Sequence, residues 1–278
     1  MNAIARNRPT IWVVGMHRSG TSLLTRVLSY LGANAGPEDT HVKPTKWNPD
    51  GLFELEALVQ VNDSFLQSLH CTWYDSYVFD LDRVPADDLS RGQLQVKALH
   101  DSICAASPCT PVFKDPRLCL TIPAFVQKQD RVVLVVRDPL AVALSVDERD
   151  RFGLPVALAL WEMYNVRASK NLKDSQPLVI IYDNLLESPR HEIRRIAEHV
   201  SGVIPVAVER ERHKGASEIV RGRARHSTIR RSDFVLPWHE DKWDQLRSNR
   251  LHAVCKDGVS PHSVALLHML RRLRLAQH

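Results

Sequence analysis

Residues 15–22 read Gly-Met-His-Arg-Ser-Gly-Thr-Ser, directly after the apolar run Thr10–Val14 and directly before Leu23. The apolar positions from Leu23 onward recur with helical spacing, so the order predicts a strand, a tight loop and the start of a helix. Gly15 and Gly20 allow the backbone to turn without steric cost. The first amides of the new helix are unpaired and lie at the positive end of its dipole. The stretch therefore predicts a phosphate-binding loop.

This loop has the Gly-x4-Gly spacing of a P-loop but differs from it in the position of the cation. Thr21 stands where nucleoside-triphosphate enzymes have lysine, and Arg18 lies two residues before the second glycine instead. Ser19, Thr21 and Ser22 add hydroxyl donors, and Arg18 adds a charged fork that suits phosphate oxygens. The loop is thus typical of phosphate binding without the usual triphosphate chemistry.

Four short apolar runs, rich in β-branched residues, have the character of buried parallel strands. They span residues 10–14, 110–113, 131–136 and 177–181. Helical patterns lie between them, and Ser-Pro pairs at 188–189 and 260–261 mark the starts of two later helices. We expect an α/β fold with a P-loop-like, mostly parallel sheet flanked by helices on both faces. Ligands of such folds bind at the carboxyl ends of the strands.

The length of 278 residues suits one large core, and we expect a single domain over 1–278 with a flexible N-terminus over 1–9. That N-terminus has no apolar core and does not resemble a secretory signal. No stretch approaches the roughly 20 apolar residues of a membrane span, which argues against stable membrane insertion. Five scattered cysteines without zinc spacing indicate reduced thiols and a cytoplasmic location.

The formal net charge of +5 is concentrated between residues 206 and 231. This segment has eight lysines or arginines against three glutamates, which accounts for the whole excess. One interpretation is a solvated loop; the one we favour is a mobile basic flap over 206–231 that closes over a polyanionic small molecule. No aromatic residues interleave with these arginines, which argues against a nucleic-acid partner.

A second cation follows the strand expected at 131–136. Arg137 ends this strand, Pro139 starts the next helix, and Ser145 lies eight residues after the arginine. An arginine at this place can bind a second phosphate beside the serine hydroxyl, or it can pair with a structural carboxylate. A triphosphate-hydrolysing P-loop enzyme usually has an acidic residue at such a strand end to hold magnesium. The strand end thus offers a second phosphate grip in place of a magnesium ligand.

Together these residues resemble the sulfotransferases that use 3′-phosphoadenosine-5′-phosphosulfate (PAPS), over about residues 11–200. The loop is similar to those of bacterial and carbohydrate-type members. The resemblance implies that the 5′-phosphosulfate is bound by Arg18, Ser19, Gly20, Thr21 and Ser22. It also implies that Arg137 and Ser145 bind the 3′-phosphate and that Tyr182 lies near the adenine.

Sulfuryl transfer requires cations at the leaving phosphate and a base for the proton of the acceptor, but no metal. Arg18 and Lys114 are the candidate cations. Cytosolic members of the family carry a catalytic histidine two residues after a similar lysine, and here this position is Pro116. Carbohydrate-modifying members often use a glutamate downstream of the P-loop helix, which corresponds to Glu54. Glu54 is therefore the candidate base, with His17 inside the loop as the alternative.

The resemblance implies PAPS as donor, adenosine 3′,5′-bisphosphate (PAP) as product, and a hydroxyl or amine acceptor. The glutamate-type base suggests a saccharide. Two alternatives are an ATP-dependent small-molecule kinase and a nucleotide-binding module without catalysis. A structural role for Glu54 at a helix start also stays open. Trp161 and Tyr164 occur at helical spacing, and we expect them in the core rather than in a sugar site.

Overall fold

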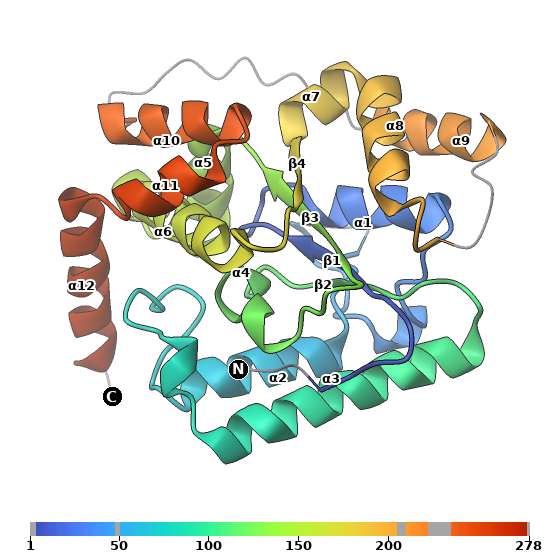
Figure 1. The fold of residues 1–278 in the computed structure, drawn as a ribbon. Coiled ribbons are helices and arrows are strands. Elements are labelled where there is room, and N and C mark those ends of the chain that lie inside the picture. Colours follow the sequence, from blue (N-terminus) through green and yellow to red (C-terminus); the bar gives the residue numbers. More distant parts are fainter. Residues whose placement is uncertain (1–3, 48–50, 205–209, 222–234, 277–278) are drawn as a thin grey trace.

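The computed structural model describes residues 4–47, 51–204, 210–221 and 235–276 (Figure 1). Its centre is a four-stranded sheet in the order β2-β1-β3-β4, and all neighbouring strands are parallel. The strands are β1 (Ile11–Val14), β2 (Val112–Lys114), β3 (Arg131–Val136) and β4 (Leu178–Ile181). The predicted α/β class and parallel sheet are confirmed, and each predicted strand boundary lies within two residues of the observed one.

Helices cover both faces of this sheet (Figure 1). Because side chains alternate along a strand, Ile11 and Val13 pack on one face while Trp12 and Val14 pack on the other. The first face is covered by α1 (Thr21–Tyr30), α8 (Pro189–Val200) and α9 (Arg210–Arg221). The second is covered by α2 (Glu56–Gln67), α3 (Ala86–Ala106), α4 (Leu118–Thr121), α5 (Pro139–Asp150) and α6 (Leu154–Leu172).

The starts of the helices follow the sequence signals closely. Helix α1 begins directly after Gly20, and α5 begins at Pro139, where the Asp138 carboxylate accepts a hydrogen bond of 2.9 Å from the amide of Ala141. The predicted start of α8 at Pro189 is confirmed, although the short helix α7 (Tyr182–Glu187) lies between it and β4. Each strand therefore leads within a few residues to a helix N-terminus or a tight turn at one edge of the sheet.

The C-terminal segment packs against α6 through α10 (Pro237–Arg247), α11 (Leu251–Asp257) and α12 (Pro261–Leu275). Glu162 of α6 is completely buried there. It accepts hydrogen bonds from the Ser260 amide (2.7 Å), the Ser260 hydroxyl (2.8 Å) and the Ser263 hydroxyl (2.5 Å). Trp243 and Leu267 share the hydrophobic core of the second face. The single domain over 1–278 stays our prediction.

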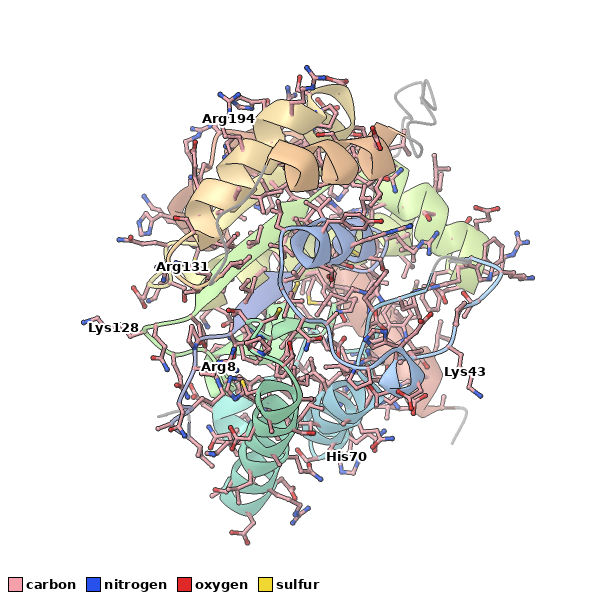
Figure 2. The ribbon with its side chains drawn as sticks, turned by 90° about the vertical axis from the view of Figure 1, so that its right-hand side faces the viewer. Arg8, Lys43, His70, Lys128, Arg131 and Arg194 are labelled. Carbon is pink, nitrogen blue, oxygen red and sulfur yellow. The ribbon has the colours of Figure 1, made fainter. Side chains whose placement is uncertain are left out.

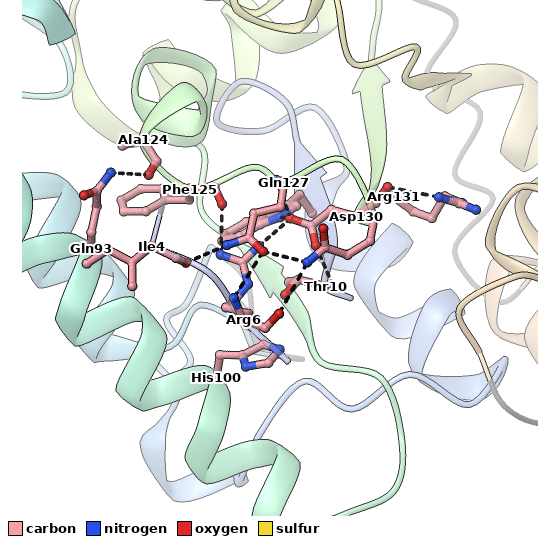
Figure 3. Close-up of polar contacts among 12 residues, drawn as sticks. Ile4, Arg6, Thr10, Gln93, His100, Ala124, Phe125, Gln127, Asp130 and Arg131 are labelled. Carbon is pink, nitrogen blue, oxygen red and sulfur yellow. Dashed lines mark hydrogen bonds and ion pairs between the residues drawn. The ribbon is translucent and has the colours of Figure 1, made fainter. Parts of the chain in front are cut away.

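The N-terminal segment differs from the expected flexible tail over 1–9. From residue 4 onward it is attached to the loop before β3 (Figure 3). Arg6 is buried, pairs with Asp130, and donates a hydrogen bond of 2.9 Å to the carbonyl of Phe125. Gln127 donates through Nε2 to the carbonyl of Ile4 at 2.6 Å. The attachment of this segment has an electrostatic reason, since Arg6 supplies the cation that a buried Asp130 requires.

The predicted basic flap over 206–231 is described only over 210–221, where the structure shows helix α9 rather than a mobile loop. This helix packs on α1 and α8 with Ala216 and Val220 completely buried. These two residues lie four apart and so occupy one face of the helix. The rest of the predicted flap, 206–209 and 222–231, lies outside the described residues.

The basic side chains labelled in Figure 2 are spread over the periphery. Lys43 lies in the loop before α2, Lys128 in the loop before β3, and Arg194 on α8, and all three are exposed. These three cations therefore do not form a common patch. Among the helices that the structure describes, none is both long and apolar enough to cross a bilayer.

Candidate active site

A cavity of about 380 Å³ lies where the four strands end. The loop 15–22 follows β1, Lys114 ends β2, Arg137 follows β3 and Tyr182 follows β4. Nine of the predicted site residues line this cavity: His17, Arg18, Gly20, Thr21, Ser22, Glu54, Lys114, Arg137 and Tyr182. Of the other two, Ser19 is buried within the loop and Ser145 contacts Arg18 from α5. The residues predicted from the sequence are therefore brought together at one place.

The loop requires glycine at two positions because other groups approach its backbone closely. Gly20 has a φ of 95°, and a Cβ atom there would lie 2.1 Å from the ring of Tyr182. A Cβ atom at Gly15 would lie 2.6 Å from the carbonyl oxygen of Val135. Arg18 also has a left-handed backbone, with a φ of 67°. The backbone is thus turned tightly beneath Tyr182, at the N-terminus of α1.

Several buried polar atoms at the cavity lack hydrogen-bond partners among the described residues. They are the Ser19 hydroxyl, Nε2 of His17 and Nε of Arg137. Leaving a buried donor or acceptor unsatisfied costs about 1–3 kcal/mol, so native structures rarely retain such groups without a ligand or water. The donors suit the oxygens of a phosphate, and they lie at the helix N-terminus that also favours an anion.

Arg18, Ser145 and Arg137 form one connected group. Nε of Arg18 donates to the Ser145 hydroxyl at 2.8 Å, and Arg137 donates through a terminal nitrogen to the carbonyl of Arg18 at 3.1 Å. The Arg137 guanidinium also lies 4.7 Å over the Tyr182 ring. Within the described residues, neither arginine pairs with a carboxylate. The structural ion pair considered for Arg137 is therefore not found there. Burial is the largest cause that lowers the pKa of Arg18, and the charges of Arg149 and Arg137 lower it further, against the opposing charges of Glu148 and Asp150.

Glu54 and Lys114 form a buried ion pair across the cavity from this group. Nζ of Lys114 lies 2.6 Å from Oε1 of Glu54 and donates to the carbonyl of Leu52 at 2.8 Å. The same nitrogen is 3.4 Å from the hydroxyl of Ser22, at the start of α1. Helix α2 begins two residues after Glu54, so this carboxylate lies before the helix rather than in its first turn.

His17 lies between the rings of Trp73 and Tyr164, with centroid distances of 4.4 and 5.8 Å. Burial, followed by the nearby charges of Arg117 and Arg149, lowers the pKa of His17 well below its ordinary range. Its imidazole is therefore neutral at pH 7 and can accept a proton, although the lowered pKa makes it a weak base.

The cavity is also lined by residues that were not predicted as site residues, and Trp73, Arg149 and Arg117 are among them. Trp73 comes from the loop after α2, and nothing in its local sequence marks it as a site residue. Arg149 follows Ser145 by four residues, and this helical spacing is a signal that could have revealed it. Arg117 lines the cavity but is paired with Asp63 (2.6 Å) and with the buried Asp115 (3.0 Å).

The two aromatic residues expected in the core are found there. Trp161 and Tyr164 are completely buried in α6. The indole of Trp161 donates to the carbonyl of Arg137 at 3.1 Å, and the Tyr164 hydroxyl donates to the carbonyl of Trp73 at 2.7 Å. Both thereby fix the backbone of cavity residues. Within the described ranges, no three His, Cys, Asp or Glu residues are grouped as ligands for a metal ion.

Comparison with known proteins gives a consistent family. The family model described as "Sulfotransferase family" matches residues 9–202. The chain is similar to the sulfotransferase domain of the Synechococcus PCC 7002 olefin synthase, with 19% identity, 97% of each chain covered and a TM-score of 0.45. It is similar to sulfotransferase STF1 from Mycobacterium tuberculosis, with 16% identity, 76% of this chain and 71% of that chain covered, and a TM-score of 0.48. The chain is also similar to mouse sulfotransferase SULT7A1, which was solved with PAP, with 15% identity, 91% of this chain and 88% of that chain covered, and a TM-score of 0.43. No match is found among curated proteins.

Proposed function

The chain belongs to the sulfotransferase family, and on this basis we propose that it transfers a sulfuryl group from PAPS to a hydroxyl or amine and releases PAP. One observation carries the choice of donor. Within the described residues, the buried Ser19 hydroxyl and Nε of Arg137 are unpartnered, and the neighbouring Arg18 forms no ion pair with a carboxylate. A nucleotide with phosphates at its 3′ and 5′ positions supplies acceptors and negative charge for both arginines.

In this proposal two groups of residues bind the two phosphate ends of the donor. The 5′-phosphosulfate is bound by the loop amides and by Arg18, Ser19, Gly20, Thr21 and Ser22. The 3′-phosphate is bound by Arg137 and Ser145, and the adenine lies near Tyr182. Because Arg18 contacts Ser145 and Arg137, the two groups of phosphate-binding residues are adjacent, and a single ligand can reach both.

The chemistry needs one proton acceptor and a neutralised leaving group. The acceptor oxygen or nitrogen attacks sulfur, the bond from sulfur to the bridging oxygen of the 5′-phosphate breaks, and the acceptor proton passes to a base. We assign the base to Glu54, with His17 as the alternative. Arg18, Lys114 and the amides of α1 stabilise the charge that develops on the leaving phosphate. Lys114 contacts both Glu54 and Ser22, and so connects the base with the phosphate loop.

The acceptor is a small molecule, and we propose a saccharide because of the glutamate-type base. A cytoplasmic location stays a prediction that rests on the free cysteines. Both points are independent of the donor assignment, and neither is needed for the binding test below.

Ligand binding separates this function from the two alternatives. We expect PAP to raise the melting temperature of the protein, by the equivalent of about 2.7 kcal/mol at 100 times its Kd. ATP with magnesium should have a much smaller effect. Stabilisation by ATP with magnesium, together with no stabilisation by PAP, would favour the kinase. PAP binding without any PAP formation from PAPS, over a panel of saccharide, phenol and amine acceptors, would favour the non-catalytic module.

The same panel gives a metal test. We expect formation of PAP from PAPS to survive EDTA, because the proposed electrophilic groups are Arg18, Lys114 and backbone amides. Loss of turnover on chelation, restored by magnesium, would contradict the proposal.

A further inference from the structure

The cavity contains a third arginine that the proposed donor contacts do not use. Arg149 is the last but one residue of α5, four residues after Ser145, so the two side chains lie on the same face of the helix. It lines the same cavity as Arg18 and Arg137. Among the neighbouring charges, that of Arg149 lowers the pKa of Arg18 the most, and that of Arg137 comes next.

The contacts of Arg149 are partial. Its Nε bonds to Asp150 at 2.8 Å, and its guanidinium lies 5.1 Å from the ring centroid of Trp73. Its terminal nitrogens donate to none of the described residues, and its side chain is 23% exposed. Arg149 is therefore held by the ion pair through Nε and by the cation–π contact, while its terminal nitrogens can bind an anion.

Three guanidinium groups consequently lie close together at the side of the cavity where Arg18 contacts Ser145. Arg18 bonds to the Ser145 hydroxyl, Arg137 bonds to the backbone of Arg18, and Arg149 projects from the next turn of the same helix. Gathering like charges is unfavourable unless a polyanion is bound among them. The cavity cations Lys114 and Arg117 pair with carboxylates. Arg149 pairs with Asp150 through Nε only, so its terminal nitrogens stay available for an anion.

We propose that Arg149 is a third arginine of the 3′-phosphate subsite, and that it exchanges its contact with Trp73 for the phosphate when the nucleotide binds. This inference rests on the proposed function, because it takes PAP as the ligand. It adds a residue to the donor site, and it means that the Trp73 ring face next to Arg149 is uncovered only after the donor has bound.

Calorimetric titration of two nucleotides tests the assignment. PAP carries the 3′-phosphate and AMP does not. We expect Arg149→Gln to weaken PAP binding about 10- to 100-fold, the range of one charge-assisted contact, and to change AMP binding less than about twofold. Arg149→Lys should recover part of the loss. Arg151→Gln is the matched control, since it removes the same charge two residues away from an exposed position outside the cavity.

Each other outcome contradicts a defined part of the inference. Equal weakening of PAP and AMP would place Arg149 at the 5′ end of the nucleotide. Unchanged PAP binding in Arg149→Gln would remove Arg149 from the donor site. If the wild-type protein binds PAP no better than AMP, the proposed function itself fails, and the inference with it. Thermal melts without ligand show whether each variant is folded.

A double-mutant cycle tests the exchange with Trp73. If Trp73 competes with the phosphate for Arg149, Trp73→Leu should tighten PAP binding about two- to fivefold, which corresponds to the lost cation–π contact. The same substitution in the Arg149→Gln background should have no effect on PAP binding. An equal effect in both backgrounds, or none in either, would refute the exchange.

Discussion

The two ends of the central sheet treat buried charge in opposite ways. At the amino ends of β1 and β3, Asp130 is completely buried and fully bonded. It pairs with Arg6, and it accepts from the amides of Thr10 and Gln127 at 2.9 Å and from the Trp12 indole at 2.8 Å (Figure 3). This cluster closes the network around its two charges, although Nε of Arg6 and the hydroxyl of Thr10 are buried without hydrogen-bond partners among the described residues.

At the carboxyl ends of the same strands, the network is left open. Arg18 and Arg137 have no carboxylate partner among the described residues, and Ser19 retains an unbonded hydroxyl. The contrast shows how a structural cluster differs from a candidate binding site in one molecule. Both ends contain arginine, but Arg6 at the amino end is neutralised by Asp130, whereas the two arginines at the carboxyl end have no such partner among the described residues. The following substitutions test this contrast, from the largest expected effect to the smallest.

The largest effect is expected at the closed end. Asp130→Asn removes the charge beside the buried Arg6, and breaking one partner of a buried pair costs about 3–5 kcal/mol of unfolding free energy. Asp88→Asn is the control, because Asp88 pairs with Arg91 at the surface and such pairs contribute about 0–1 kcal/mol. Urea denaturation measures both. A loss as small as that of the control would show that the network is not essential to the fold.

At the open end, Glu54→Gln should lower turnover about 10²- to 10⁴-fold while PAP affinity stays near that of the wild type. The substitution keeps the volume of the side chain and removes the basic oxygen that Lys114 contacts. PAP formation from PAPS and calorimetry with PAP measure the two effects. Full activity in Glu54→Gln together with loss of activity in His17→Asn would transfer the base to His17. A loss of folding would instead favour a structural role for Glu54.

Arg137→Ala should weaken PAP binding about 10- to 100-fold, because one charge-assisted contact is worth about 1.5–3 kcal/mol. We expect little change in the unfolding free energy without ligand, since Arg137 forms no ion pair with a carboxylate of the described residues. Arg131→Ala is the matched control at the other end of β3, where Arg131 donates to the carbonyl of His199. The comparison fails if Arg131→Ala weakens PAP as much as Arg137→Ala.

The smallest effect concerns pH. The lowered pKa of His17 means that the unfolded chain binds a proton below about pH 6.5 that the folded protein excludes. This contribution to stability is complete above pH 6.5 and is lost as the pH falls toward the folded pKa, with a slope of up to about 1.4 kcal/mol per pH unit. His17→Gln should therefore reduce the loss of stability between pH 6.5 and 5, measured by urea denaturation at each pH. An unchanged slope would show that His17 does not titrate in this way.

Much of the fold and of the site could be predicted because the signals are local. The loop 15–22 carries its own spacing, and the eight residues from Arg137 to Ser145 span one strand end and two helical turns. The β-branched run at 131–136 predicts a strand with the same bounds as the observed β3. The attachment of the N-terminus could not be predicted, since the partner of Arg6 lies 124 residues away.

The sequence by itself determined which groups line the cavity: the loop 15–22 with Arg18, the strand-end Arg137, and the acid and cation of Glu54 and Lys114. These follow from residue type and short spacing, which fix the local backbone. The tertiary structure decided which of these charges are paired. Whether an arginine meets a carboxylate, an indole or only a cavity depends on segments distant in the chain, because hydrogen bonding and ion pairing act over a few ångströms of space and not along the sequence.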